Sequence, residues 1–489
     1  MAKYITTDTE LTSIANAIRA KGGTSASLEY PDEFISAIQN IPSGGSSSSE
    51  GDVIFIDYDG SIVDAKSKAE INAMTSDSDL PANPTHTGLT AQGWNWTVTQ
   101  LKAQLTAMPD QKIYVGQMYV TTSGATEIDV VMQEGRLNPT LTICSNGTIL
   151  VDWGDGTTPD EVTGSSYTTR QAVSHTYARA GNYTIKISKT SGDGYAFYGS
   201  STYLLLRKNA TSASENIVYA NAIQNIRIGN NARISNSSFY NCYSLASITI
   251  PSTVTSIGSN AFCACYSLTN ITIPSTVTSI GSSAFQNCSS LARITIPSTV
   301  TSIGNSAFYG CYSLASIIIP STVTSIGNNA FCICYSLASI IIPSSVMSIG
   351  SNAFQNCYSL ASIIIPSDVA SIGDKAFCAC YSLTNITIPS TVTSIGSSAF
   401  YSCHSLARIT IPSDVTSIGN SAFQYCYGMS EYHFQSETVP TGGTTMFANI
   451  ASDGVIYVPY SADHSILEAY KTATNWSIYA SYMQEEPQS

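Results

Sequence analysis

A 23-residue repeat dominates the second half of the chain and restricts the folds that it can adopt. One phenylalanine and one cysteine each recur nine times at this interval. The phenylalanines are Phe239, Phe262, Phe285, Phe308, Phe331, Phe354, Phe377, Phe400 and Phe423. The cysteines are Cys242, Cys265, Cys288, Cys311, Cys334, Cys357, Cys380, Cys403 and Cys426. A fixed period of about 20–50 residues is typical of a solenoid, in which each unit packs mainly on its neighbours.

The apolar positions within one unit predict a short strand. In the repeat that contains Phe262, Leu268, Ile271 and Ile273 alternate along a β-branched run and are expected to point inward. Asn270 and Thr272 are then expected to point outward. A proline ends the strand, and a glycine later in the unit allows a sharp turn. Stacking of such units would bury their inward side chains against one another.

Over residues 239–434 this pattern resembles the BspA-type leucine-rich repeats of bacterial surface proteins. The resemblance implies a curved β-solenoid used for binding, without enzymatic activity of its own. After the last repeat, we expect a strand at 454–459 and a helix with Ile466, Leu467 and Tyr470, followed by Trp476, to close the open end. We therefore assign residues 208–436 to the solenoid and 437–489 to a C-terminal cap.

Two stretches before the repeat alternate as strands bounded by turn residues, one around Trp153 and one around Tyr177. They resemble the strands of a polycystic-kidney-disease (PKD) type domain, an immunoglobulin-like β-sandwich, over residues 126–207. Asp152, Asp155 and Asp160 offer carboxylates to calcium, but their spacing differs from that of the twelve-residue calcium loop. We favour turn formation by these aspartates.

The first 125 residues predict three smaller parts. Residues 1–42 read as a helical hairpin for attachment, too small to bury a core alone, and residues 43–52 as a flexible linker. Residues 53–125 read as a small α/β module. Together with the stretch 80–96, this module resembles tail-region proteins of phages and prophages of gut Gram-positive bacteria, and the hairpin resembles a segment of the same set.

A strand that ends in Asp57 and Asp59 is the one stretch suggestive of chemistry. It resembles the nucleophile motif of haloacid-dehalogenase phosphatases, where Asp57 would attack a phosphoryl group and Asp59 would act as acid and base. Such an enzyme needs a larger α/β domain than about 70 residues supply. We therefore favour a strand followed by a tight Asp-Gly turn.

Composition excludes several partners. The net charge is −13 and only 11% of residues are charged, so the chain lacks the basic stripe that binds nucleic acid or an anionic membrane. No apolar run reaches the roughly 18–20 residues of a membrane span, and no signal peptide is evident. The 13 cysteines are interpreted as reduced, buried thiols, because nine of them mark one position of a repeat. No cofactor or metal is expected.

Histidines and cysteine pairs give no metal pattern. The histidines are His86, His175, His404, His433 and His464. They are scattered, and we expect structural or surface roles for them. The C-x-C pairs Cys263/Cys265, Cys332/Cys334 and Cys378/Cys380 each contain a repeat cysteine, which favours packing over metal binding.

Two rows of side chains are candidates for ligand contact. Tyrosines follow most of the repeat cysteines and are expected to stack, with Ser289 and His404 interrupting the row: Tyr243, Tyr266, Tyr312, Tyr335, Tyr358, Tyr381 and Tyr427. Mutual packing and receptor contact are both open for these tyrosines, of which Tyr312, Tyr335 and Tyr358 are the predicted contacts.

The outward strand positions form the second row. Three successive units carry Ile318, Ile341 and Ile364 where the others carry threonine, with Arg293 and Arg408 on either side. We predict a receptor contact with this apolar core and a polar rim, although simple repeat duplication would also produce it.

These patterns predict a receptor-binding protein of a phage or prophage tail, assembled in the bacterial cytoplasm and released by lysis. Its receptor would be a host-surface protein or glycan, and its N-terminal modules would join other virion proteins, with a homo-oligomer left open. The first alternative is a BspA-type adhesin at the bacterial cell surface. A glycan-degrading tail enzyme is the second alternative.

Overall fold

The computed structural model describes residues 52–107, 112–199, 204–208 and 219–487. These residues form two compact units, which we call the first and the second unit and which meet in the sequence between Cys311 and Tyr312. The predicted helical hairpin at 1–42 and nearly all of the linker at 43–52 lie outside the described residues. No helix in the described part combines the length and apolar character needed to cross a bilayer.

The first unit begins with a small α/β module. Its elements are β1 (Val53–Ile56), β2 (Ile62–Lys66), α3 (Lys68–Ala73), η1 (Asp77–Asp79), β3 (Leu89–Trp94), α4 (Val98–Ala107) and β4 (Ile113–Thr121). The strand order is β2-β1-β4-β3, and β1 and β4 are parallel. Ile71 from α3 and Leu101 and Leu105 from α4 are buried in its core. The α/β module expected at this place is present.

Seven strands follow the module: β5 (Thr126–Met132), β6 (Pro139–Asp152), β7 (Asp160–Ser165), β8 (Gln171–Ser174), β9 (Gly181–Lys189), β10 (Gly194–Phe197) and β11 (Leu206–Lys208). They do not form a separate sheet. β5 pairs with β12 (Ile223–Arg227), and β10 pairs with β13 (Ala232–Ile234). β12 in turn pairs with the first repeat strand, β14 (Ser247–Thr249). The upstream strands therefore continue into the first coils and cover the edge at which the solenoid begins.

The coils of the first unit bury the side chains that the repeat pattern assigned to the interior. Its repeat strands are β14, β15 (Asn270–Thr272) and β16 (Arg293–Thr295). Leu268, Ile271 and Ile273 are at most 2% exposed. Isolated parallel bridges join Ile234, Ile257, Ile280 and Ile303 along a second side of the coils. The predicted inward face is confirmed.

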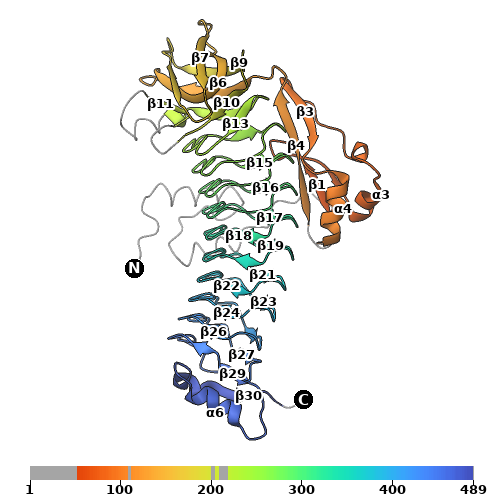
Figure 1. The fold of residues 1–489 in the computed structure, drawn as a ribbon, viewed down its shortest axis with the longest axis vertical. Coiled ribbons are helices and arrows are strands. Elements are labelled where there is room, and N and C mark those ends of the chain that lie inside the picture. The colour runs from red at the N-terminus through yellow and green to blue at the C-terminus, as the bar shows by residue number, and fades with distance from the viewer. Residues whose placement is uncertain (1–51, 108–111, 200–203, 209–218, 488–489) are drawn as a thin grey trace, which may run out of the picture. The chain divides into compact units, whose positions relative to one another are not determined.

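The second unit stacks parallel strands on two sides (Figure 1). One side holds β17 (Ser316–Ile318), β19 (Ser339–Ile341), β21 (Ser362–Ile364) and β23 (Asn385–Thr387), and further β25 (Arg408–Ile411) and β27 (Glu431–Phe434). The other side holds β18 (Ser325–Ile326), β20 (Ser348–Ile349), β22 (Ser371–Ile372), β24 (Ser394–Ile395), β26 (Ser417–Ile418) and β28 (Thr441–Gly442). The mainly β fold with a repeat solenoid agrees with the sequence prediction.

On a third side of each coil, two residues with a positive backbone φ lie on either side of the repeat phenylalanine. In the coil of Phe285 these are Ser283 and Asn287, with φ of 55° and 58°. The N–H groups of Ser283, Phe285 and Asn287 each donate to a carbonyl of the next coil at 2.7–2.8 Å. Asn, Ser and Gly suit such positions because they tolerate a positive φ better than branched residues. Other residue types also occur at these positions, among them Ala264, Tyr425 and the β-branched Ile333, which has φ of 63°.

Phenylalanines and cysteines line the interior of the coils. Phe285 and Phe308 stack with ring centroids 5.5 Å apart, and Phe354 and Phe377 stack at 5.6 Å. The thiol of Cys288 donates to the carbonyl oxygen of Phe262 at 3.1 Å, and the same bond recurs along each unit. All 13 cysteines are free and buried. The repeat cysteine is therefore buried, as the sequence interpretation proposed, and its thiol also donates a hydrogen bond.

The end of the second unit is closed by residues beyond the last repeat. Here lie β29 (Val455–Val458), α6 (Ser465–Thr472), η2 (Ser477–Tyr482) and β30 (Met483–Glu485). β29 and β30 extend the strand stack that begins with β25 and β27. Trp476 is fully buried and donates its indole N–H to the Pro440 carbonyl at 2.8 Å. The expected strand, helix and tryptophan of a cap are all present.

Candidate binding surfaces

The second unit carries a continuous column of aromatic rings, one from each coil. Successive centroids lie 5.1, 4.6, 4.7, 4.7 and 5.4 Å apart along Tyr312, Tyr335, Tyr358, Tyr381, His404 and Tyr427. The spacing follows from the roughly 4.8 Å separation of parallel strands. His404 was expected to interrupt the row. Instead it stacks on Tyr381 with an interplanar angle of 11°, because a flat imidazole fills the same place as a phenol ring.

This column presents ring edges to solvent. Each inner ring has its two faces covered by neighbours, so a ligand would meet the ring at its edge. Partial burial lowers the pKa of His404, which favours the uncharged ring. Tyr427 ends the column, is tilted by 33° against His404 and is 57% exposed. In the first unit Tyr243 and Tyr266 stack at 4.7 Å, and the buried Ser289 follows them, so the predicted interruption at Ser289 is confirmed.

The three isoleucines of the predicted receptor contact differ in exposure. Ile318, Ile341 and Ile364 are paired in register on β17, β19 and β21. Ile364 is 70% exposed and Ile341 is half-buried, whereas Ile318 is only 6% exposed. The expectation that all three face solvent is therefore wrong for Ile318.

The two arginines of the predicted contact have different surroundings. Arg293 belongs to the first unit, where its guanidinium carbon lies 5.4 Å from the centroid of the Tyr114 ring. Arg408 belongs to the second unit, is well exposed and lies 3.7 Å from the carboxylate of Glu431. Receptor contact by these residues stays a prediction.

The α/β module covers the outward strand positions of the first unit. β4 lies against β14, β15 and β16, and the coils stack beside the module in Figure 1. Thr249, Asn270, Thr272 and Thr295 are buried as a result. The expectation that outward residues face solvent is wrong here, because it treated the repeat without the module that packs on it.

Close approach between module and coils depends on small and amide-bearing residues. A Cβ atom at Gly116 would overlap the side chain of Thr272. Asn95 accepts from the Gly116 N–H at 2.8 Å and donates its amide to the Ile273 carbonyl at 3.1 Å. The Ser252 N–H donates to the Gln92 side chain at 2.8 Å. The interface is thus built from polar contacts and a glycine in mid-strand.

The chain forms the expected tight Asp-Gly turn directly after β1. The Gly60 N–H donates to the Asp57 carbonyl at 3.0 Å, and Gly60 has φ of 86°. The Asp57 carboxylate is almost fully buried and pairs with His86 Nε2 at 2.7 Å. Burial, and next the proximity of Asp57, raise the pKa of Tyr119, whose ring packs edge-on against His86. Asp57 is therefore a buried residue of the module, and its carboxylate holds His86 in place.

The aspartates near Trp153 also serve turns. Asp152 accepts from the Gly154 N–H, and Asp155 accepts from Thr157 and pairs with His175 at 2.8 Å. Asp160 accepts from the Trp153 indole at 2.7 Å. The favoured interpretation, turn formation, is confirmed for Asp152 and Asp155, whereas Asp160 holds the Trp153 side chain.

The remaining histidines serve structure as well. His433 and His464 pair with carboxylates of the cap, at 2.6 and 2.8 Å. Within the described residues, no group of three His, Cys, Asp or Glu side chains is arranged to hold a metal ion.

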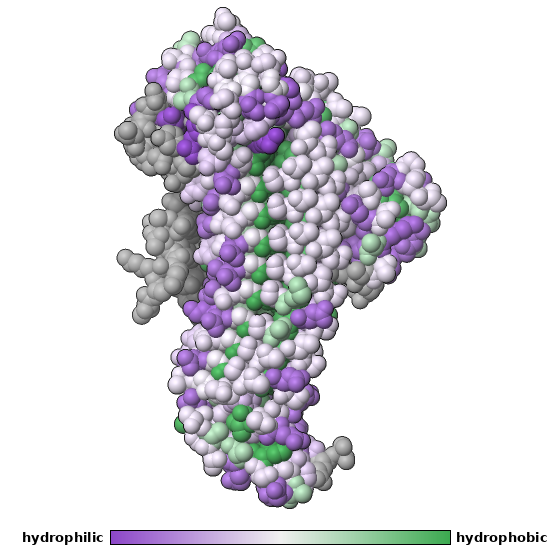
Figure 2. All heavy atoms as spheres, viewed as in Figure 1, coloured by the Kyte–Doolittle hydropathy of each residue, from purple (hydrophilic) through white to green (hydrophobic). Residues whose placement is uncertain are grey.

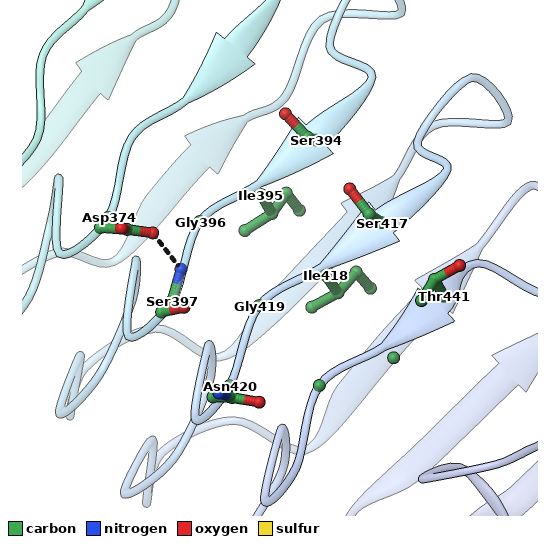
Figure 3. Close-up of a pocket in the computed structure, with 12 residues that line it drawn as sticks. Asp374, Ser394, Ile395, Gly396, Ser397, Ser417, Ile418, Gly419, Asn420 and Thr441 are labelled. Atoms are coloured by element: carbon green, nitrogen blue, oxygen red, sulfur yellow. Dashed lines mark hydrogen bonds between the residues drawn. The ribbon is translucent and has the colours of Figure 1, made fainter.

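One shallow hollow of about 340 Å³ lies on the other side of the second unit, over β24, β26 and β28 (Figure 3). It is lined by small residues such as Ser394, Ser417 and Gly419, and the Ser397 N–H donates to Asp374 at 2.7 Å beside it. The coils in Figure 2 show mainly weakly polar residues of this kind. The hollow has few groups that would orient a ligand.

Three solved structures match part of this chain. A leucine-rich repeat protein of T. pallidum is 32% identical, and the match covers 37% of this chain and 83% of that one, with a TM-score of 0.31. One from Bacteroides ovatus is 26% identical over 53% and 77% of the two chains, with a TM-score of 0.35. One from Eubacterium ventriosum is 25% identical over 56% and 73%, with a TM-score of 0.32. No curated protein gives a significant match.

The family model described as "BspA type Leucine rich repeat region" matches residues 177–269, 232–361 and 347–463. These matches span more than half of the chain. Nothing in them supports the predicted PKD-type domain or the predicted phage-tail module. With its repeat, its stacked coils and this match, the chain belongs to the BspA-type leucine-rich repeat family.

Proposed function

We propose that this chain is an adhesin-like binding protein of the bacterial cell surface, which holds a host or mucosal ligand on its solenoid and catalyses no reaction. Membership of the BspA-type family supports this alternative over the predicted phage-tail role. In the described residues Asp57, the residue that the phosphatase resemblance makes a nucleophile, pairs with His86, and Asp155 pairs with His175.

The observation that carries the proposal is the regular exposed array on the second unit. The aromatic column offers a phenol edge in four successive coils, from Tyr312 to Tyr381. The repeat strands on the same coils carry the exposed Ile364 and the half-exposed Ile341. A row of equal groups about 4.8 Å apart suits an extended ligand, such as a glycan chain, that makes the same contact several times.

The proposed contact combines tyrosine hydroxyls with an apolar centre. Hydroxyls of Tyr335 and Tyr358 would hydrogen-bond to the ligand, because the ring faces are already covered. Ile341 and Ile364 would supply the apolar centre of the contact. Ile318 is left out of it because it is buried.

Binding of the full chain to immobilised mucin and to cultured epithelial cells tests this proposal. Tyr358→Phe removes one hydroxyl and keeps the stack, and Ile364→Thr gives the residue that the following coil carries as Thr387. We expect the double variant to bind at least about tenfold more weakly, since a lost hydrogen bond and a lost apolar contact at an interface together cost more than 1.4 kcal/mol.

Met347→Thr is the matched control. Met347 is 60% exposed and lies next to β20 on the other side of the unit, and the substitution gives the residue that the preceding coil carries as Thr324. We expect unchanged binding by this control and no release of glycan from the mucin. Equal binding by all three proteins would place the contact elsewhere, and no binding by the natural chain would refute the proposal for these ligands.

A further inference from the structure

Two pairs of coils in this chain are near copies of each other. Residues 261–285 of the first unit are identical to residues 376–400 of the second. The following coils, 286–308 and 401–423, differ at four positions. The outward residues of the two pairs are the same, so Asn270, Thr272, Arg293 and Thr295 correspond to Asn385, Thr387, Arg408 and Thr410.

The first copy is occupied by the chain's own α/β module. Gly60 lies against Asn270, Gly116 against Thr272, and the Tyr114 ring beneath Arg293. Asn95 also donates to the Ile273 carbonyl. Thr272 and Thr295 are 7% and 3% exposed in this docked state.

The second copy presents the same groups without such a cover. Asn385, Thr387, Arg408 and Thr410 are all exposed. The amide of Asn385 donates to Thr384 at 3.2 Å, as that of Asn270 donates to Thr269 at 3.3 Å. Asn385 therefore already has the side-chain arrangement that Asn270 has in the docked state.

One difference between the two surfaces favours docking at the second. Thr249, on the coil before the first copy, is buried beneath the module, and its hydroxyl has no hydrogen-bond partner. The corresponding residue of the second copy is Ile364, which is 70% exposed. Covering an isoleucine removes apolar surface from water, whereas covering an unpaired hydroxyl costs free energy.

We propose that the outward face of residues 385–410 is a second docking site for an α/β module of the same build as residues 53–125, presented by another chain. That module would place a glycine over Thr387, an aromatic ring beneath Arg408 and an amide on the Ile388 carbonyl. The occupied first copy shows the complementary surface, and each contact residue of β15 and β16 recurs in the second copy. The site would join chains in an assembly, and it does not rest on the proposed adhesive function.

Matched substitutions in the full-length chain test this site. Thr272→Arg places a long charged side chain under Gly116 and is expected to release the chain's own module. The released module should then dock on the second site of another molecule, so that this variant forms dimers and larger species in sedimentation velocity. Thr387→Arg, the same change in an identical coil, should sediment like the natural chain.

The double variant Thr272→Arg/Thr387→Arg decides between docking and nonspecific association. It has a released module but a blocked second site, so we expect it to be monomeric. Association of the double variant to the same extent as Thr272→Arg would overturn the proposal, as would a Thr272→Arg variant that stays monomeric while its module remains folded. Trp94 and Trp96, both buried in the module, report its folding by fluorescence.

A cross-link in a milder background covers the case in which Thr272→Arg unfolds the module. Arg293→Glu removes the guanidinium that lies over the Tyr114 ring and should weaken docking of the module on its own coils. Tyr114→Cys/Arg293→Glu chains are mixed with Arg408→Cys chains and treated with a short bis-maleimide. Native cysteines are buried and should not react. Tyr114→Cys/Arg293→Cys within one chain is the positive control. We expect 114–408 cross-links between chains, and their absence while the control reacts would refute the second site.

Discussion

Identical sequence has different surroundings in the two units. Residues 261–285 and 376–400 share every residue, yet Thr272 is covered by the α/β module and Thr387 is exposed. Their interiors are the same, since Phe285 and Phe400 are both fully buried in stacked columns. The repeat therefore determines what a coil buries inside, whereas its outer surface depends on what the rest of the chain brings to it.

The largest expected effect tests whether the two interiors are equivalent. Phe285→Ala and Phe400→Ala each remove a fully buried ring and should lower the free energy of unfolding by about 3–5 kcal/mol. Denaturant titrations of the two variants should give the same loss within about 1 kcal/mol. A markedly smaller loss at one position would show that the interiors differ despite their sequence.

Gly116→Ala tests the module contact that only the first unit has. The backbone at Gly116 is not in the left-handed region, so alanine would normally be tolerated in this strand. Because its Cβ would overlap Thr272, we expect a loss of about 1–3 kcal/mol in unfolding free energy. Thr272→Ala should restore part of the loss, and Thr387→Ala should restore none. Equal rescue by both would contradict the docking described here.

The left-handed positions allow a smaller, stabilising test. Ile333 in the second unit adopts φ of 63°, where the first unit has Asn287 at 58°. Ile333→Asn should raise the unfolding free energy by about 1 kcal/mol, because a branched side chain is strained in this conformation. Asn287→Ile should lower it by a similar amount. Thermal unfolding checks both, and a destabilised Ile333→Asn variant would mean that the apolar contacts of Ile333 outweigh its strain.

The smallest expected effect depends on pH. His404 occupies the place that Ser289 has in the first unit, and partial burial lowers its pKa from the ordinary value of 6.5. A lowered folded-state pKa means that the unfolded chain binds the proton more tightly. The stability from neutral His404 is therefore full above about pH 6.5 and is lost as the pH falls below it. The difference between the unfolding midpoints at pH 5 and pH 7.5 should be slightly smaller in the His404→Tyr variant than in the natural chain. An unchanged difference would refute this.

Periodicity made the interior and the cap predictable. Leu268, Ile271 and Ile273 alternate with polar residues, and Trp476 follows an amphipathic helix, so local pattern was enough to place them. The burial of Thr272 and of Ile318 was not predictable from the repeat. For Thr272 the cause is a contact with Gly116, which is 156 residues away in the sequence. Gly116, a glycine inside the observed strand β4, is the one signal that points to such close approach.

The candidate site was predicted only in part. The tyrosine column followed directly from the period, whereas the place of His404 in it needed the stacking geometry of an imidazole. The unequal exposure of Ile318 and Ile364 depends on three-dimensional surroundings that a repeat cannot encode, because both residues occupy the same position in their coils.

Reduced cysteines usually suggest that a protein resides in a reducing compartment, but the hydrogen-bonded thiols of this chain do not support that inference. The reacting species of a cysteine is its thiolate, and burial raises the pKa of Cys242 to about 12. Each inner thiol is also out of contact with solvent and occupied by a carbonyl of the coil before it. Reduced cysteines in this chain thus do not require a reducing compartment. The solenoid would keep them as thiols after export into an oxidising medium, and its stability there would owe nothing to disulfide bonds.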